Sequence, residues 1–202
     1  MGSPGSMAHN PLQRIALLFR TYDGSSQSVQ ENRMEKWVLL DWGDTLMRTF
    51  DYPGPMVSWP RVEALPGALE TLRTLQGRIG IALATNAADS EEHEIRAALA
   101  MVGLDPFVER IFCFRSVGHK KASPPFFAHV RAQLELPAQR LLMVGDDFKQ
   151  DVLAAKEAGI RSIWFNARTT DSRSDTEFCT IHEFAELPPK LETWGFLGPG
   201  HP

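Results

Sequence analysis

WVLLDWGDTL, residues 37–46, is the stretch that decides the fold of this chain. Four apolar residues, too few for an isolated helix, run straight into the carboxylate of Asp41, and a glycine, a second acid and a threonine follow. A buried strand has this pattern when it delivers an acid to the edge at which open parallel sheets bind ligands. Asp44 and Thr45 would also suit a plain polar turn after a strand. What the other strands deliver to that edge decides between the two interpretations.

The composition bounds the class of protein. With 202 residues, of which 43% are hydrophobic, the chain can bury one good core and is short for two domains. A net charge of -4 supplies no basic field for nucleic acid or anionic lipid. No apolar run reaches the ~20 residues of a membrane span. Cys113 and Cys179 lie far apart beside apolar or β-branched residues, which favours reduced thiols and a cytoplasmic protein.

One folded domain is expected over residues 34–193. Residues 1–33 begin with a Gly/Ser/Pro-rich stretch typical of an expression-tag remnant and continue into a polar leader that is expected to be flexible. Residues 194–202 are expected to form a C-terminal tail. Its first residues, with Trp194 and Phe196, are expected to pack on the domain or on a partner.

From Met34 onward, candidate strands and helices alternate. This order predicts an α/β fold with three layers, a Rossmann-like parallel sheet with helices on both faces. The expected strands are 37–40, 79–84, 111–114, 141–144 and 160–165, and the expected helices are 68–75, 91–101, 124–134 and 152–158.

Polar side chains at the ends of these strands indicate a common chemistry. Asp41, Asp146 and Asp151 at one sheet edge would repel one another unless a hard cation lay between them, and such carboxylates suit Mg2+. Thr85 and Lys121 would add a hydroxyl, an N–H group and a positive charge, which are groups that bind phosphate. A carboxylate beside Mg2+ can attack phosphorus and form an aspartyl-phosphate that water later hydrolyses.

The chain from about Glu35 to Leu187 resembles the phosphatase branch of the haloacid dehalogenase-like (HAD) superfamily. Four motifs in the family's order carry the resemblance: Asp41 with Thr45, Thr85-Asn86, Lys121 with Pro124, and Gly145-Asp146 with Asp151. The resemblance implies a Mg2+-dependent phosphate-ester hydrolase.

The same resemblance implies a role for each acidic position. Asp41 would be the nucleophile and a Mg2+ ligand, and the backbone carbonyl of Gly43 would be a second ligand. Asp146 would bind the metal directly. Asp151 would bind it through water or would hold Lys121.

The phosphoryl group would be bound by Thr85, Asn86 and Lys121. Lys120 competes for this role, but the Lys-x-x-Pro spacing favours Lys121. Considered by itself, Lys121 could be a solvated surface lysine. Asp147 is expected only to cap the helix that follows it.

One position departs from the family pattern. Phosphatases of the superfamily carry a second Asp two residues after the nucleophile, which protonates the leaving group and then activates water, and here that position is Gly43. Such an acid/base group contributes ~10²–10⁴-fold in rate. Three interpretations stay open. Asp44 reaches the site through a turn that Gly43 permits, the substrate has a good leaving group, or the protein is an attenuated phosphatase that chiefly binds.

A second departure concerns the cap domains that the superfamily inserts after the first motif or between the second and third. Neither interval has room for more than a loop or a helix and a strand, so no large cap domain is expected. The loop Met47–Glu63, with Tyr52 and Trp59, would overhang the site. An open site suits a phosphorylated macromolecule, or a phosphorylated small molecule with a second subunit of a homo-oligomer as the lid.

Two rival functions remain. The first is a catalytically attenuated phosphate-binding or regulatory protein on the same scaffold, which Gly43 favours. The second is a dehalogenase, which would also use Asp41 but needs no metal. Asp146 and Asp151 count against the dehalogenase, because two further acids at that edge make sense chiefly around a cation.

Overall fold

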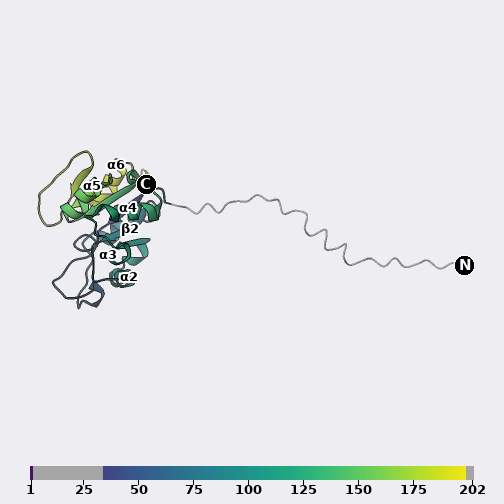
Figure 1. Ribbon diagram of the computed structural model, residues 1–202, viewed down its shortest axis with the longest axis horizontal. Coiled ribbons are helices and arrows are strands. Elements are labelled where there is room, and N and C mark those ends of the chain that lie inside the picture. Colours follow the sequence, from purple (N-terminus) through teal and green to yellow (C-terminus); the bar gives the residue numbers. More distant parts are fainter. Residues whose placement is uncertain (2–33, 199–202) are drawn as a thin grey trace. The chain divides into compact units, whose positions relative to one another are not determined.

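The computed structural model describes Met1 and residues 34–198 (Figure 1). The chain divides between residues 33 and 34 into two units, and the helices and strands described belong to the second. The expectations for the N-terminal leader and for the last four residues lie outside the described residues. Phe196 and Leu197 are both buried in the core, so the segment after the last helix packs on the domain.

A parallel sheet of six strands forms the middle of the unit, and this confirms the expected fold class. The strands are β1 (Trp37–Leu40), β2 (Gly80–Thr85), β3 (Arg110–Cys113), β4 (Leu141–Gly145), β5 (Arg161–Phe165) and β6 (Phe178–Ile181). Their order is β3-β2-β1-β4-β5-β6, and every neighbouring pair is parallel. Leu40, the last residue of the central strand β1, pairs with Leu83 of β2 and Val144 of β4, so the chain leaves all three strands at one edge.

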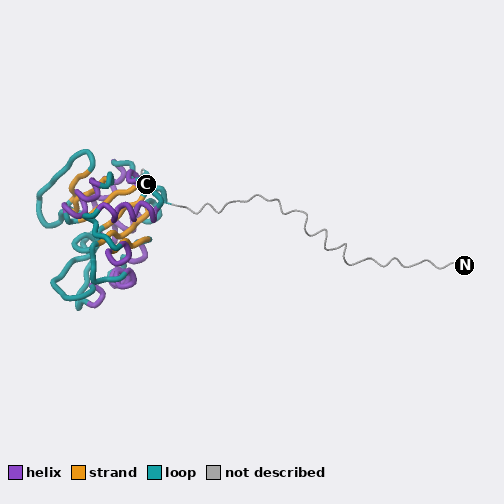
Figure 2. Tube along the Cα trace, in the orientation of Figure 1, coloured by secondary structure: helices purple, strands orange, loops and turns teal. Residues whose placement is uncertain are grey.

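Helices cover both faces of this sheet (Figure 2). They are α1 (Ala68–Leu75), α2 (Glu92–Met101), α3 (Phe114–Val117), α4 (Pro124–Leu134), α5 (Ala154–Glu157) and α6 (Leu187–Thr193), with short 3-10 turns at Met56–Ser58, Asp105–Phe107, Ala138–Arg140 and Phe184–Glu186 and a π-helical segment at Phe148–Leu153.

Alternate residues of β1 enter two separate cores, as the two-residue period of a strand requires. Val38 and Leu40 pack with α1, α2 and α6 on one face of the sheet. Trp37 and Leu39 pack with α4 and α5 on the other face. The two cores make the three layers, and they hold β1 so that the residue after Leu40 emerges at the sheet edge.

The structure corrects several expected element bounds. The strand expected at 111–114 ends at Cys113, and α3 begins at Phe114. The helix expected at 152–158 starts earlier, as the π-helical segment Phe148–Leu153, and continues as α5. Strand β6 was not expected, because four residues after a long polar stretch carry little pattern.

No folded cap domain interrupts residues 34–198. A loop with one 3-10 turn separates β1 from α1, and α2 with another 3-10 turn separates β2 from β3. The loop after β1 is closed at its base, because the Arg48 amide donates to the Glu63 carbonyl and the Leu65 amide donates to the Leu46 carbonyl, each at 2.9 Å. None of the helices described is both long and apolar enough to cross a membrane.

Candidate active site

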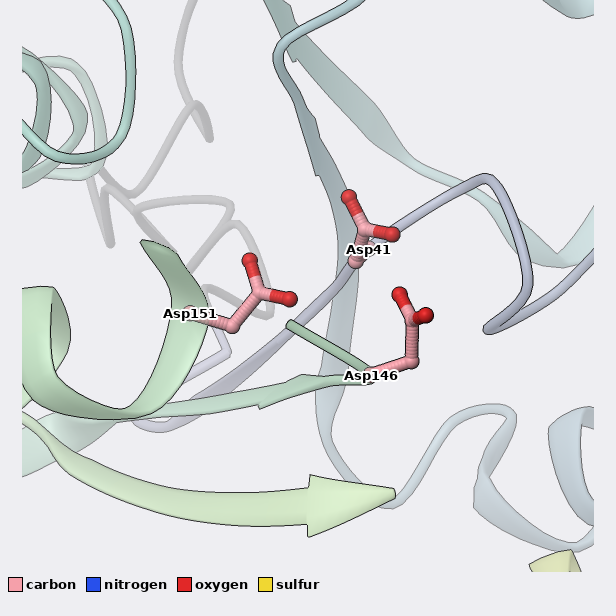
Figure 3. Close-up of side chains that lie close together, drawn as sticks. All are labelled: Asp41, Asp146 and Asp151. Carbon is pink, nitrogen blue, oxygen red and sulfur yellow. The ribbon is translucent and has the colours of Figure 1, made fainter. Parts of the chain in front are cut away.

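Three carboxylates meet at the carboxyl edge of the sheet (Figure 3). Asp41 follows β1, Asp146 follows β4, and Asp151 lies in the π-helical segment. One oxygen from each carboxylate lies within 4.8 Å of the other two. Asp41 and Asp151 are 7% and 0% exposed, so two of the three acids are buried and need partners for their charges.

Lys121 supplies the positive charge at the centre of this cluster. Its Nζ contacts Asp41 Oδ1, lies 2.6 Å from Asp151 Oδ1, and donates to the Ala84 carbonyl at 3.1 Å. Burial lowers the pKa of Lys121, but the charges of the two carboxylates outweigh burial and raise the pKa above its ordinary value. The lysine therefore stays protonated. Lys120, the competing candidate in the sequence, is exposed.

Thr45 joins the ends of β1 and β4. Its hydroxyl donates to Asp41 Oδ2 at 3.3 Å and accepts from the Asp146 amide at 3.1 Å. Desolvation, and after it the charge of Asp41, raises the pKa of Asp146 to about 6, although Arg168 opposes the shift. The Asp146 carboxylate therefore lies in a place where a further positive charge would be favourable.

Asp151 reaches the site because the helix after β4 starts with a wide π turn. Such turns are rare and often lie at functional sites. Asp147 begins the turn as its N-cap and accepts from the amides of Lys149 and Gln150, each at 2.9 Å, as the sequence predicts. Asp151 Oδ2 accepts from the Asp147 amide at 3.0 Å, and burial raises the pKa of Asp151.

Thr85 is the last residue of β2, and Asn86 follows it. The Thr85 hydroxyl accepts from the Ala87 amide at 3.2 Å, so its own hydrogen is free to donate. The Asn86 side chain accepts from the Lys121 amide at 2.8 Å and donates to Gln150 at 2.7 Å. Asn86 thus ties the lysine loop to the π-helical segment.

The departure at position 43 has a local structural basis. Asp44, rather than Gly43, is the residue with left-handed backbone, at φ 52°. Its carboxylate accepts from the Thr49 amide at 3.1 Å and pairs with Arg168 at 2.5 Å. A Cβ on Gly43 would lie 2.7 Å from Thr49 Oγ1. The turn therefore places one carboxylate beside the site from position 44 and leaves no room for one at position 43 unless Thr49 moves.

A cavity of about 320 Å³ opens above these groups. Every residue that the sequence predicts for the site lines it: Asp41, Gly43, Asp44, Thr85, Asn86, Lys121, Asp146 and Asp151. Sequence reasoning did not single out Gln150 or Arg168. Arg168 follows β5, and the rule that found the other residues, polar side chains after a strand, also applies there.

Residues 54–159, more than half of the chain, match the model of the haloacid dehalogenase-like hydrolase family. The chain belongs to this family. The matched part contains Thr85, Lys121, Asp146 and Asp151, and it begins after the turn with Asp41.

Individual relatives agree with this membership. Over 136 residues the chain is 30% identical to ribulose-1,5-bisphosphate 5-phosphatase of Halopiger xanaduensis, in a match that covers 61% of this chain and 56% of that protein. The chain spans about half the length of the curated relatives it matches.

Solved structures show the same fold. An uncharacterized protein from Listeria monocytogenes serotype 4b superposes with a TM-score of 0.70 at 23% identity, over 79% of this chain and 98% of that chain. The putative HAD-hydrolase YfnB from Bacillus subtilis, solved bound to magnesium, superposes with a TM-score of 0.56 at 24% identity, over 64% of this chain and 55% of that chain.

Proposed function

We propose that this protein is a Mg2+-dependent phosphate monoester hydrolase that works through an aspartyl-phosphate on Asp41. The observation that carries the proposal is the buried contact of Lys121 with Asp41 and Asp151, beside a third carboxylate. A nucleophilic carboxylate, a permanent cation and a free threonine hydroxyl then line one cavity. The similarity to a ribulose-1,5-bisphosphate 5-phosphatase and to a HAD-hydrolase that was solved bound to magnesium supports the same chemistry.

The donor set fits Mg2+. One oxygen from each of the three carboxylates lies within 4.8 Å of the other two, and carboxylate oxygens are ligands that Mg2+ prefers. Asp41, Asp146 and the carbonyl of Gly43 would hold the ion, with Asp151 acting through water. When bound, the ion neutralises the carboxylates and phosphoryl oxygens and lets the two groups approach.

The chain's own residues account for the rest of the reaction. Lys121 and the Thr85 hydroxyl bind the phosphoryl oxygens, and a carboxylate oxygen of Asp41 attacks phosphorus. The bond from phosphorus to the leaving oxygen breaks, and that oxygen takes a proton from Asp44. Water, losing a proton to Asp44, then attacks the same phosphorus and breaks its bond to Asp41. Phosphate leaves, and the Asp41 carboxylate is restored.

A second candidate, a phosphate-binding protein with weak turnover, has one observation in its favour. Asp44 already pairs with Arg168 at 2.5 Å, so its carboxylate is engaged by a guanidinium group, whereas a general acid must be available to the leaving group. The dehalogenase alternative is less favoured. A dehalogenase needs no metal ion, so it gives no reason for Asp146 and Asp151 to lie beside Asp41.

Substrate and setting are part of the same proposal. The open cavity admits a phosphorylated small molecule or a phosphorylated segment of a macromolecule, and a second copy of the chain could complete the lid. The free thiols of Cys113 and Cys179 fit a reducing, cytoplasmic setting.

Hydrolysis of para-nitrophenyl phosphate tests the proposal, because its good leaving group needs little help from an acid. We expect turnover that requires Mg2+ and disappears in Asp41→Asn. Asp105→Asn is a matched control, since its carboxylate pairs with Arg96 away from the site. No turnover by folded protein in Mg2+ would reject the phosphatase and favour the binding protein.

A further inference from the structure

A second cavity adjoins the candidate active site. It has a volume of about 330 Å³, and Asp44 and Asp146 line both cavities. Its outer wall comes from the end of β5 and the loop that follows, residues 164–173. A ligand whose phosphate lies on the acidic cluster would extend into this second cavity by passing over Asp44.

Arg168 stands at the junction of the two cavities. Its Nη2 lies 2.5 Å from Asp44 Oδ2 and 3.4 Å from Asp146 Oδ2. The other N–H groups of this guanidinium have no acceptor among the described residues, and 66% of the side chain is exposed. The Arg168 guanidinium therefore lines the second cavity with N–H donors that no described residue uses.

Arg173 adds a second guanidinium on the same wall. It lies over the rings of Phe148 and Trp164, at 4.4 and 5.3 Å from their centroids. These contacts engage the faces of the rings and leave the N–H groups of Arg173 available, and no carboxylate in the described part of the chain pairs with them. Stacking of this kind fixes the position of an arginine without using its hydrogen-bond donors.

The backbone that carries both arginines is held in place. Asn166 donates to the Thr169 hydroxyl at 2.7 Å and to the Asp171 carbonyl at 2.9 Å, which shapes the turn around Arg168. The hydroxyl of Thr180, in β6, accepts from the Arg173 amide and donates to the Arg173 carbonyl, each at 2.8 Å. These hydrogen bonds therefore fix the backbone of the loop near both arginines.

We propose that Arg168 and Arg173 form a second anion-binding subsite, so that the substrate is a phosphomonoester with a second oxyanion, a phosphate or a carboxylate, a short distance from the reacting phosphate. Guanidinium groups bind both oxyanions through paired N–H donors. The cavity also contains the carboxylates of Asp44, Asp146 and Asp171. Arg168 Nη2 pairs with the first two, so the donors left for an oxyanion are the other N–H groups of Arg168 and those of Arg173. The proposal rests on the phosphatase function proposed above.

The test uses phosphonates, whose carbon–phosphorus bond is not hydrolysed, so that binding is measured whether or not the protein turns over. The probes share a three-carbon chain that carries one phosphonate, a phosphonate at each end, or a phosphonate and a carboxylate. Calorimetry of the full chain in Mg2+ should show about tenfold or tighter binding of at least one doubly anionic probe. The probe that is preferred identifies the second oxyanion.

Variants assign the preference to residues. Arg168→Gln and Arg173→Gln should each remove most of it, and Arg173→Lys should restore part. Arg161→Gln is the matched control, because Arg161 also stacks on an indole, that of Trp194, but lies at the opposite end of β5. Equal affinities in the wild type, or a preference that survives in both glutamine variants, would overturn the proposal.

The two proposals fail separately. Para-nitrophenyl phosphate carries no second anion, so its turnover reports on the phosphatase alone. A phosphonate preference without aryl phosphate turnover would keep the subsite and reject catalysis. Aryl phosphate turnover without a preference for doubly anionic phosphonates would keep the phosphatase function and reject the subsite.

Discussion

Gly145 and Asp151 lie so close together that a Cβ on residue 145 would be 2.1 Å from Asp151 Oδ2. Glycine ends β4, and the π-helical segment folds back over it to bring the carboxylate onto Lys121. The motif Gly145-Asp146 therefore serves two purposes. Its aspartate joins the acidic cluster, and its glycine makes room for a second acid.

Gly145→Ala is expected to displace Asp151 and destabilise the protein. Overpacking a buried site costs about 1–3 kcal/mol, and the displaced carboxylate would no longer hold Lys121. Urea unfolding should show the lower stability, and calorimetry should show weaker Mg2+ binding. Gly198→Ala is the control, because nothing lies within 4 Å of a Cβ there. Equal stability and Mg2+ affinity of the two variants would contradict the assigned role of Gly145.

The contribution of Asp146 to stability should depend on pH in opposite directions with and without Mg2+. The pKa of Asp146 is raised to about 6 by desolvation and by Asp41, so without metal the folded state binds a proton more readily than the unfolded state. The contribution of Asp146 to the free energy of unfolding should therefore rise as the pH falls from about 7 toward about 4. Saturating Mg2+ favours the ionised carboxylates, so stability should then fall over the same range.

The measurement is urea unfolding of wild type and Asp146→Asn at about pH 7.5 and about pH 5, in chelator and in Mg2+. The difference between the two proteins isolates Asp146 from other groups, such as Asp147, whose pKa is lowered by hydrogen bonds from Gln150 and Lys149 despite partial desolvation. A difference that does not change with pH would show that Asp146 does not titrate as described.

Much of the fold was predictable because its signals are local. The bounds expected for α4, Pro124–Leu134, agree with the structure, since a proline start and an apolar face mark that helix. The strand–helix alternation also predicts the parallel sheet, and the residues after β1, β2 and β4 predict the site. Because the site residues lie at the ends of strands, the position of each strand is enough to predict them.

The parts that were missed depend on tertiary contacts. The π turn that begins at Phe148 packs Asp151 against Gly145, and this contact has no local signal in the sequence. Strand β6 exists because the edge of β5 is available for pairing. The contact between Asp44 and Arg168 joins residues that are 124 positions apart, so sequence spacing gives no sign of it.

Asp44→Asn tests the proposed acid. Asparagine has the same shape and tolerates left-handed backbone, so the turn should persist. Loss of a general acid should slow hydrolysis of an alkyl phosphate by ~10²–10⁴-fold, with a smaller effect on para-nitrophenyl phosphate. Asp51→Asn, an exposed acid in the same loop, is the control and should behave as the wild type. An unchanged alkyl phosphate rate would exclude Asp44 from proton transfer.

An acid at position 43 should rescue the loss at position 44. Gly43→Asp would place a carboxylate two residues after Asp41, but its Cβ would lie 2.7 Å from Thr49 Oγ1, so Thr49→Ala must accompany it. In an Asp44→Asn background, this pair of changes should recover about tenfold or more of the lost alkyl phosphate turnover. Gly43→Asp without Thr49→Ala should recover less, because the clash displaces the new side chain. If neither combination restores any rate while Mg2+ binding is intact, then a missing acid is not what limits turnover, and the phosphate-binding function gains support.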